Sequence, residues 1–499
     1  MRSKKALYNI ISSAFLQVIT VICGFIVSKL IISNYGSNIN GLVSSITNFL
    51  AFITLLEAGF GPVIKSLLYK PIANNNDYEL KKILKSSLNL FRKISYIFII
   101  YVLILCVILP IFFSNDFDIL YTFSLIIIIS LSTFFEYYLG ITYRLFLQAK
   151  QTDYVLSLIK IITLILHTIV IVILINLNAN IHIVKLASSL IFILRPIVTY
   201  LYVKRKCNIN LKNVKVEYNI KQKWDGLVQH IAHIIHKNTD IVVITFFCSL
   251  SEVSVYSIYY LILNSLNNFV CYPFIGGVSA AFGDMIAKGE NDNLTKSFNV
   301  FECIYLTIVS IAFISTPFLI VPFVKVYTNG ITDANYIRPI FAYIIVLAEF
   351  VFVIRQLYYS LVKVSGDFKQ TKNGAIIEAL VNVLLSFILV WKLGIVGVAI
   401  GTLVAMIIRT IEIVIYTSKN ILKRSINIFV KRFSLIVIEF LLILLIVNLL
   451  PQIDVSSYFD WIYKSLIVFT ISSLVIILIN GIIYKENVFL LINKLRNKK

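Results

Sequence analysis

Polar side chains interrupt one apolar run of the sequence between residues 229 and 240. At about 100° per residue, most of these polar side chains fall on one face of a helix. They are Gln229, His230, His233, His236, Lys237 and Asp240, and they include three of the five histidines of the chain. A charge at the centre of a bilayer costs on the order of 2.5–3.5 kcal/mol on insertion scales. If this run crosses a membrane, the polar face must contact a partner, a water-filled cavity or a ligand.

The residue types on this face indicate ligand binding rather than catalysis. A zinc site from His230, His233 and His236 is disfavoured, because this spacing turns each ligand further around the helix and no Cys or carboxylate pattern accompanies it. The sequence contains no nucleophile elbow, no H-E-x-x-H and no phosphate-binding G-x-x-x-x-G-K-[ST]. The six cysteines are scattered without a paired spacing. We therefore expect no metal, no cofactor and no enzymatic activity.

The composition is that of an integral membrane protein. Of the 499 residues, 59% are hydrophobic and 14% are charged, whereas a soluble domain is typically about 25% charged. The net charge of +21 is spread in short packets between apolar runs, as the positive-inside rule produces. It is not clustered in one soluble region, so we expect no nucleic-acid partner.

The apolar runs predict an all-α polytopic membrane protein with about fourteen transmembrane helices. The runs lie at 6–33, 40–64, 94–113, 119–141, 155–177, 183–203, 226–248, 254–276, 299–322, 338–361, 373–391, 395–416, 433–450 and 462–484. The weakest division is that between 373–391 and 395–416, which only Lys392-Leu393-Gly394 separates.

Charge and repetition organise these spans. Alternate connections are rich in Lys and Arg, which places both termini in the cytoplasm. The first apolar run is too long for a signal peptide, so we expect it to be a spanning helix. The sequence contains a weak internal repeat in which similar segments lie 214 residues apart. Each copy of the repeat would contain six spans, and the last two spans would lie outside it. The predicted parts are residues 1–205 (spans one to six), 206–432 (spans seven to twelve) and 433–499 (the last two spans and a basic tail).

Other ionisable residues also fall deep inside the spans. The cations are Arg195, Arg355 and Arg409, and the carboxylates are Asp240, Glu57, Glu302 and Glu349. Arg195 and Arg355 could instead extend to the cytoplasmic surface, and Arg409 could simply pair with Glu412. Lysines and arginines in a low-dielectric cavity favour an anionic ligand such as a phosphate. A cationic ligand would instead use the carboxylates, and that alternative stays open.

Several motifs resemble the Wzx-type oligosaccharide flippases of the MOP superfamily of transporters. They are YGSNINGL (35–42) with LLEAGFG (55–61), LFLQAKQTDY (145–154), NTD (238–240) with VSVYS (253–257), and GDFKQTK (366–372) with GIVGVAIGT (394–402). The last pair is the most specific, and the resemblance covers about residues 1–420. It implies two six-helix lobes around a central cavity that opens alternately to each side, with two further helices.

The resemblance also implies a function and its partners. The substrate would be an undecaprenyl-pyrophosphate-linked oligosaccharide, moved across the bacterial cytoplasmic membrane for synthesis of a surface polysaccharide such as capsule, the O-antigen of lipopolysaccharide, or exopolysaccharide. Membrane lipids and a polysaccharide polymerase would be its partners. The cavity residues vary within the family, so we choose the candidate site residues by their depth in the predicted spans and by the helix face on which they lie. The expected cationic cavity comprises Lys237, His233, His230, Arg355, Arg409 and Arg195, and the coupling or gating candidates are Asp240, Glu57, Glu302 and Glu349.

Three other functions compete with this interpretation. A cation-coupled drug exporter of the related MATE type would depend on the carboxylates more than on Lys237. A lipid II flippase of the same superfamily would carry arginines in its first lobe, where the first helix here offers only Lys29. A membrane-embedded glycosyltransferase or polymerase would need larger outer loops and an acidic catalytic motif.

Overall fold

The expectation of an all-α polytopic membrane protein is confirmed. The computed structural model describes residues 2–207, 209, 211, 238–451 and 453–485, and these residues form helices and connections without any strand. Twelve of the described helical segments are long and apolar enough to cross a membrane. The span predicted at 226–248 lies mostly outside the described residues, and its described part is a short apolar helix, Asn238–Phe247. Residues 433–449 of the span predicted at 433–450 lie in α16 (Asn427–Leu449), which is not among these twelve segments.

The chain divides into two compact units, residues 1–234 and 235–499. We refer to them as the first unit and the second unit. The division falls inside the segment 212–237, which lies outside the described residues.

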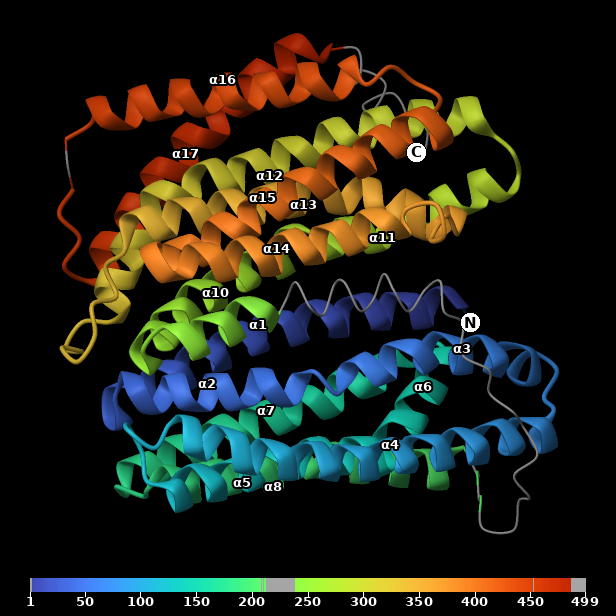
Figure 1. The fold of residues 1–499 in the computed structure, drawn as a ribbon. Helices are drawn as coiled ribbons and strands as arrows, with labels where there is room; N and C mark the ends of the chain where they lie inside the picture. Colours follow the sequence, from blue (N-terminus) through green and yellow to red (C-terminus); the bar gives the residue numbers. More distant parts are fainter. Residues whose placement is uncertain (1, 208, 210, 212–237, 452, 486–499) are drawn as a thin grey trace. The chain divides into compact units, whose positions relative to one another are not determined.

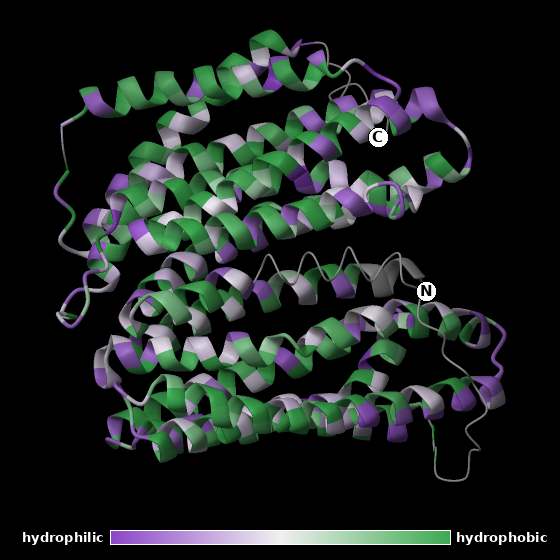
Figure 2. Cartoon of the chain, in the orientation of Figure 1, coloured by the Kyte–Doolittle hydropathy of each residue, from purple (hydrophilic) through white to green (hydrophobic). Residues whose placement is uncertain are grey.

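The first unit is a bundle of long helices (Figure 1). Its elements are α1 (Arg2–Tyr35), α2 (Ser37–Ala51), α3 (Thr54–Ala73), α4 (Asp77–Phe112), α5 (Ile119–Phe135), the π-helical turn η1 (Glu136–Gly140), α6 (Ile141–Ala149), α7 (Asp153–Asn176) and α8 (Ile181–Lys206). α1 packs on α7, α7 on α8, and α5 on both α4 and α8. Apolar residues run along these helices, while hydrophilic residues gather toward their ends (Figure 2).

The second unit contains the remaining described helices (Figure 1). They are α10 (Leu250–Val270), α11 (Tyr272–Ala287), α12 (Asn291–Tyr327), α13 (Pro339–Ser365), α14 (Lys372–Leu393), α15 (Ile395–Tyr416), the π-helical turn η2 (Thr417–Ile421), α16 and α17 (Tyr458–Ile483). α13 and α14 both pack on α15, and α17 packs on α12. The last two helices are thus attached to the second unit through α12.

Glycines bring α14 and α15 into close contact. Gly394, with φ of 55°, forms the whole connection between the two helices. Along α15, a Cβ at Gly397 would approach the Leu389 carbonyl oxygen to 2.4 Å, and a Cβ at Gly401 would approach Ser386 Oγ to 2.5 Å. Small residues at this four-residue spacing let helices approach closely in a membrane. The predicted division at 392–394 is therefore a tight antiparallel hairpin.

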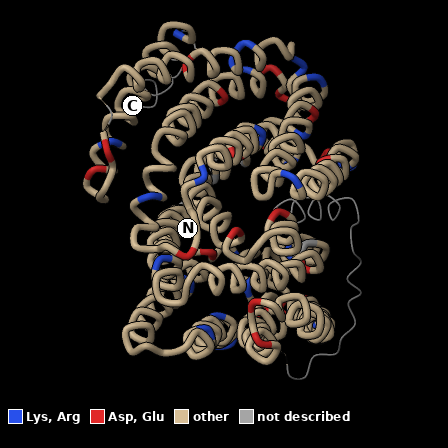
Figure 3. Tube along the Cα trace, turned by 60° about the vertical axis from the view of Figure 1, so that its left-hand side comes forward, with Lys and Arg blue, Asp and Glu red and all other residues tan. Residues whose placement is uncertain are grey.

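Charged residues are sparse along the helices, and several are buried (Figure 3). In the second unit, Arg355, Glu378, Arg409 and Glu302 are each exposed by 6% or less. Burying an ionised group is costly unless it is paired and hydrogen-bonded. The partners of these groups therefore decide which of them can take part in binding.

Candidate substrate and coupling site

Asp240 lies at the centre of a buried polar cluster in the second unit. Tyr256 Oη donates a hydrogen bond of 2.8 Å to Asp240 Oδ2, and Thr402 Oγ1 donates one of 2.7 Å to the same oxygen. Asn382 Nδ2 lies 3.3 Å from Asp240 Oδ1 and 3.0 Å from Thr402 Oγ1. The cluster joins the helix Asn238–Phe247 to α10, α14 and α15, and the close α14–α15 contact brings Asn382 and Thr402 together.

No cation of the described residues pairs with the oxygen atoms of the Asp240 cluster. Asp240 is 3% exposed, and no Lys, Arg or His of the described residues forms a salt bridge with it. Asn382 Oδ1 is buried and has no hydrogen-bond partner among the described atoms. A buried carboxylate surrounded by hydroxyl and amide groups can be neutralised by a proton or by a small hard cation, which prefers oxygen ligands.

Arg355 and Arg409 both pair with carboxylates. Arg355 Nη1 lies 2.7 Å from Glu378 Oε1, and Arg409 Nε lies 3.5 Å from Glu378 Oε2. Arg409 also binds Glu412, the partner expected from the three-residue spacing, and donates a hydrogen bond of 2.9 Å to the Thr371 carbonyl oxygen. The two arginines and two carboxylates compensate one another, and they link α13, α14 and α15.

Glu302 is fully buried and pairs with two arginines that the sequence analysis did not single out. Arg424 Nη1 lies 2.7 Å from Glu302 Oε2, Arg432 binds the same oxygen, and Tyr358 Oη donates to Oε1. These contacts connect α12, α13, the segment after η2, and α16. The network therefore fixes α16 to the rest of the second unit.

Glu349 on α13 is half-buried, and Asn267 Nδ2 of α10 donates a hydrogen bond to it. The amide links the two helices. Glu349 therefore lies in the second unit on α13, and its partner Asn267 is on α10, the helix that also carries Tyr256 of the Asp240 cluster.

In the first unit, Glu57 belongs to a charged cluster at the π-helical turn. Arg144 binds Glu57, and Arg144 Nη1 lies 3.2 Å from Glu136 Oε1. Tyr137 Oη lies 3.5 Å from Glu57 Oε2. The cluster joins α3, η1 and α6, and its two carboxylates exceed its one arginine. Single-turn π-helices are frequent at functional sites, which supports Glu57 as a coupling candidate.

Arg195 differs from the arginines of the second unit. Its Nε donates a hydrogen bond of 2.8 Å to Thr163 Oγ1, and its guanidinium carbon lies 4.2 Å from the centroid of the Phe192 ring. No described carboxylate lies within salt-bridge distance of it. Among the three arginines expected in the cationic cavity, Arg195 alone forms no salt bridge within the described part of the chain. Glu136, which pairs with Arg144, acts on Arg195 from a longer distance.

Three expected cavity residues, Lys237, His233 and His230, lie outside the described residues. Of the polar face at residues 229–240, the structure describes only Asp240. The partners of Asp240 were missed because they are uncharged, whereas the candidate site residues were chosen among ionisable groups. Asn382 in the apolar run 373–391, and Thr402 directly after Gly401, were the available signals.

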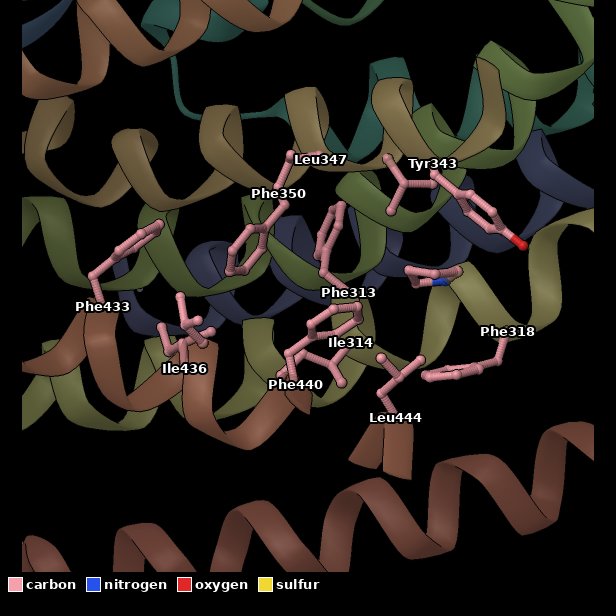
Figure 4. A pocket seen from close by; sticks show the side chains of 13 residues that line it. Phe313, Ile314, Phe318, Tyr343, Leu347, Phe350, Phe433, Ile436, Phe440 and Leu444 are labelled. Carbon is pink, nitrogen blue, oxygen red and sulfur yellow. The ribbon is translucent and has the colours of Figure 1, made fainter. Parts of the chain in front are cut away.

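A cavity of about 500 Å³ lies between α12, α13 and α16 of the second unit (Figure 4). Its lining is almost entirely apolar and aromatic, and includes Phe313, Phe350, Phe433, Phe440 and Leu444. Such a lining suits a hydrocarbon chain and offers no group for binding charge.

Comparisons with known proteins agree with this architecture. No protein-family model matches the sequence, and no curated protein sequence matches it. Solved structures do match. A lipid II flippase MurJ in an inward closed conformation has a TM-score of 0.69 at 17% identity, over 97% of this chain and 100% of that one. An inward-facing multidrug resistance MATE transporter of the MOP superfamily has a TM-score of 0.60 at 13% identity, over 83% of this chain and 98% of that one. A MOP superfamily transporter from Pyrococcus furiosus has a TM-score of 0.54 at 13% identity, over 84% of this chain and 96% of that one.

These similarities define a class of protein. The chain is a polytopic α-helical membrane protein with the fold of the MOP superfamily of transporters. At these identities the similarity concerns the fold, and the substrate must be argued from the residues.

Proposed function

We propose that this protein is a flippase that moves an undecaprenyl-pyrophosphate-linked oligosaccharide across the bacterial cytoplasmic membrane by alternating access. The transporter fold supports movement of a substrate rather than catalysis. The solved structure named as a lipid II flippase matches over 97% of this chain, and lipid II is itself a lipid-linked saccharide. This neighbour favours a lipid-linked substrate over a soluble one.

The observation that carries the proposal is that Arg195 has no salt bridge to a described carboxylate. A cation inside a membrane without a directly paired carboxylate favours an anionic ligand, and a guanidinium matches the geometry of phosphate oxygens. An exporter of organic cations would instead need negatively charged binding residues. We propose Lys237, His230 and His233 as further contacts of the pyrophosphate or of acidic sugars. Arg355 and Arg409 would contribute positive potential only, because their hydrogen bonds are taken up by Glu378 and Glu412.

We propose Asp240 as the residue that couples transport to an ion gradient. Of the four candidates, Glu57 and Glu302 are bound by arginines, and Glu349 accepts from Asn267. Asp240 is buried among neutral oxygen and amide groups, so a proton or a monovalent cation could compensate its charge. The membrane potential would add to the driving force, since moving one negative charge outward yields about 2.3 kcal/mol per 100 mV.

The test is a reconstituted flipping assay. Purified protein is placed in vesicles whose inner leaflet carries a fluorescent undecaprenyl-pyrophosphate oligosaccharide, and arrival in the outer leaflet is followed with a membrane-impermeant quencher. We expect protein-dependent transfer of this lipid and weaker transfer of lipid II. Faster transfer of lipid II would assign the protein to cell-wall precursor transport. Transport of an organic cation such as rhodamine 6G, without lipid transfer, would favour the MATE-type alternative.

A further inference from the structure

The helical hairpin of α7 and α8 carries several cations, and its only acidic residue is Asp153, the first residue of α7. Residues 154–206 contain no Asp or Glu, although Lys160, Lys185 and Arg195 lie within them. In the second unit, by contrast, the buried arginines of the described residues pair with carboxylates. The charge of the α7–α8 hairpin must therefore be compensated from outside the hairpin.

Its polar groups share one face of α8. Lys185, Ser188, Phe192 and Arg195 follow one another at intervals of three, four and three residues, the spacing of a single helix face. His167 of α7 lies against this face, with its Nε2 2.8 Å from Ser188 Oγ. The imidazole stacks on the Phe192 ring at 4.5 Å between centroids, and Arg195 lies over the same ring. Imidazole and guanidinium are thus positioned by one aromatic side chain.

Within the described residues, one ring nitrogen of His167 and the charges of two cations on this face have no direct partner. His167 is 8% exposed, and its Nδ1 is buried without a hydrogen-bond partner among the described atoms. Lys185 and Arg195 lie on the same face of α8 as Ser188, the residue that His167 contacts. No described carboxylate forms a salt bridge with either cation. Glu136 acts on Arg195 from beyond salt-bridge distance, and it is already paired with Arg144.

We propose that Lys185, His167 and Arg195 form a binding site for a phosphate-type oxyanion. The guanidinium can donate two parallel hydrogen bonds to such an anion, and the ammonium adds a point charge. With Ser188 donating to Nε2, His167 carries its proton on Nδ1 and donates it to the anion. The oxyanion supplies the hydrogen-bond partner that His167 Nδ1 lacks among the described atoms, and its negative charge compensates the two cations.

The anion can come from two sources with the same chemistry. One is free phosphate or pyrophosphate, and the other is the phosphate of a lipid head group. If the ligand is a lipid head group, the proposal rests on the proposed flippase function. The site itself rests on the composition and geometry of the hairpin.

The first experiment measures binding of inorganic pyrophosphate to the purified full-length chain in detergent by calorimetry. We expect Arg195→Gln and Lys185→Gln each to weaken binding about tenfold, the loss expected for one charge-assisted hydrogen bond. Arg195→Lys keeps the charge and should retain part of the affinity. Lys206→Gln, at the exposed end of the same helix, is the matched control and should bind as wild type. Equal affinity in all five proteins would overturn the site.

The second experiment distinguishes the sources by native mass spectrometry of the protein with undecaprenyl phosphate or with dioleoyl phosphatidylcholine. A complex with undecaprenyl phosphate that Arg195→Gln weakens assigns the site to a lipid head group. Binding of pyrophosphate alone assigns it to a free anion. Absence of binding to pyrophosphate and to undecaprenyl phosphate refutes the site, and the flipping assay then judges the proposed function independently. Conversely, anion binding without flipping leaves the site standing and rejects the flippase.

Discussion

Thr402 Oγ1 donates a hydrogen bond of 2.7 Å to Asp240 Oδ2, across 162 positions of the chain. The contact joins α15 to the short helix Asn238–Phe247, and both side chains are buried. It orients one carboxylate oxygen and leaves the cluster without a described cation. A transport cycle that depends on an ion gradient can act on this carboxylate, because its charge must be compensated each time the site is closed to water.

We expect Asp240→Asn to remove the dependence of flipping on an imposed proton or sodium gradient. The amide keeps the size and much of the hydrogen bonding of the carboxylate but cannot exchange a proton or compensate a cation. The measurement is the initial flipping rate in vesicles with and without a gradient. Asp284→Asn, at an exposed position of α11, is the control and should respond to the gradient as wild type. A full gradient response in Asp240→Asn would reject Asp240 as the coupling residue.

Lys237→Ala should abolish flipping, while Lys237→Arg should keep part of the activity. The reason is the requirement for a cation next to the pyrophosphate, which arginine satisfies and alanine does not. The variants are compared in the flipping assay at equal abundance in the membrane. Wild-type activity of the alanine variant would show that Lys237 is not a substrate contact.

Arg355→Ala should destabilise the protein more than it affects substrate affinity. Removing one partner of a buried ion pair leaves Glu378 with only the longer contact to Arg409, and losses of about 3–5 kcal/mol are typical of such changes. Thermal unfolding of the detergent-solubilised protein measures the effect, with Arg338→Ala at a half-exposed pair as the comparison. Unchanged stability together with lost substrate binding would return Arg355 to the list of substrate contacts.

Gly401→Leu should separate α14 from α15 and disrupt the Asp240 cluster. A Cβ there already meets Ser386 Oγ at 2.5 Å, so a larger side chain must push the helices apart and displace Thr402. We expect a lower melting temperature and loss of gradient-dependent flipping together. Gly481→Leu, where no atom lies within 4 Å of an added Cβ, should leave both unchanged. If Gly401→Leu behaves like Gly481→Leu, the helix contact does not support the site.

The positions of the helices could be predicted from hydropathy, because lipid requires long apolar segments. The spans at 373–391 and 395–416 correspond to α14 and α15, and the three residues between them contain the Gly394 turn. Ion pairs could be predicted from the sequence only between residues of the same helix turn, as for Arg409 with Glu412.

The long-range partners could not be predicted. Glu302 meets Arg424 and Arg432 more than a hundred residues later, and Arg355 meets Glu378 on another helix. Depth in the membrane singled out Glu302 and Arg355 but did not identify the charges that compensate them. The polar partners of Asp240 carry no charge, so a search for ionisable residues inside the spans does not identify them.

The most direct test of the central claim is to delete the gene and analyse the lipid-linked intermediates by mass spectrometry. The account predicts that an undecaprenyl-pyrophosphate oligosaccharide accumulates in the cytoplasmic leaflet and that a surface polymer is lost. Accumulation of lipid II would instead identify a cell-wall precursor flippase. An unchanged lipid profile with altered tolerance to organic cations would contradict the account and direct attention to the intramembrane carboxylates.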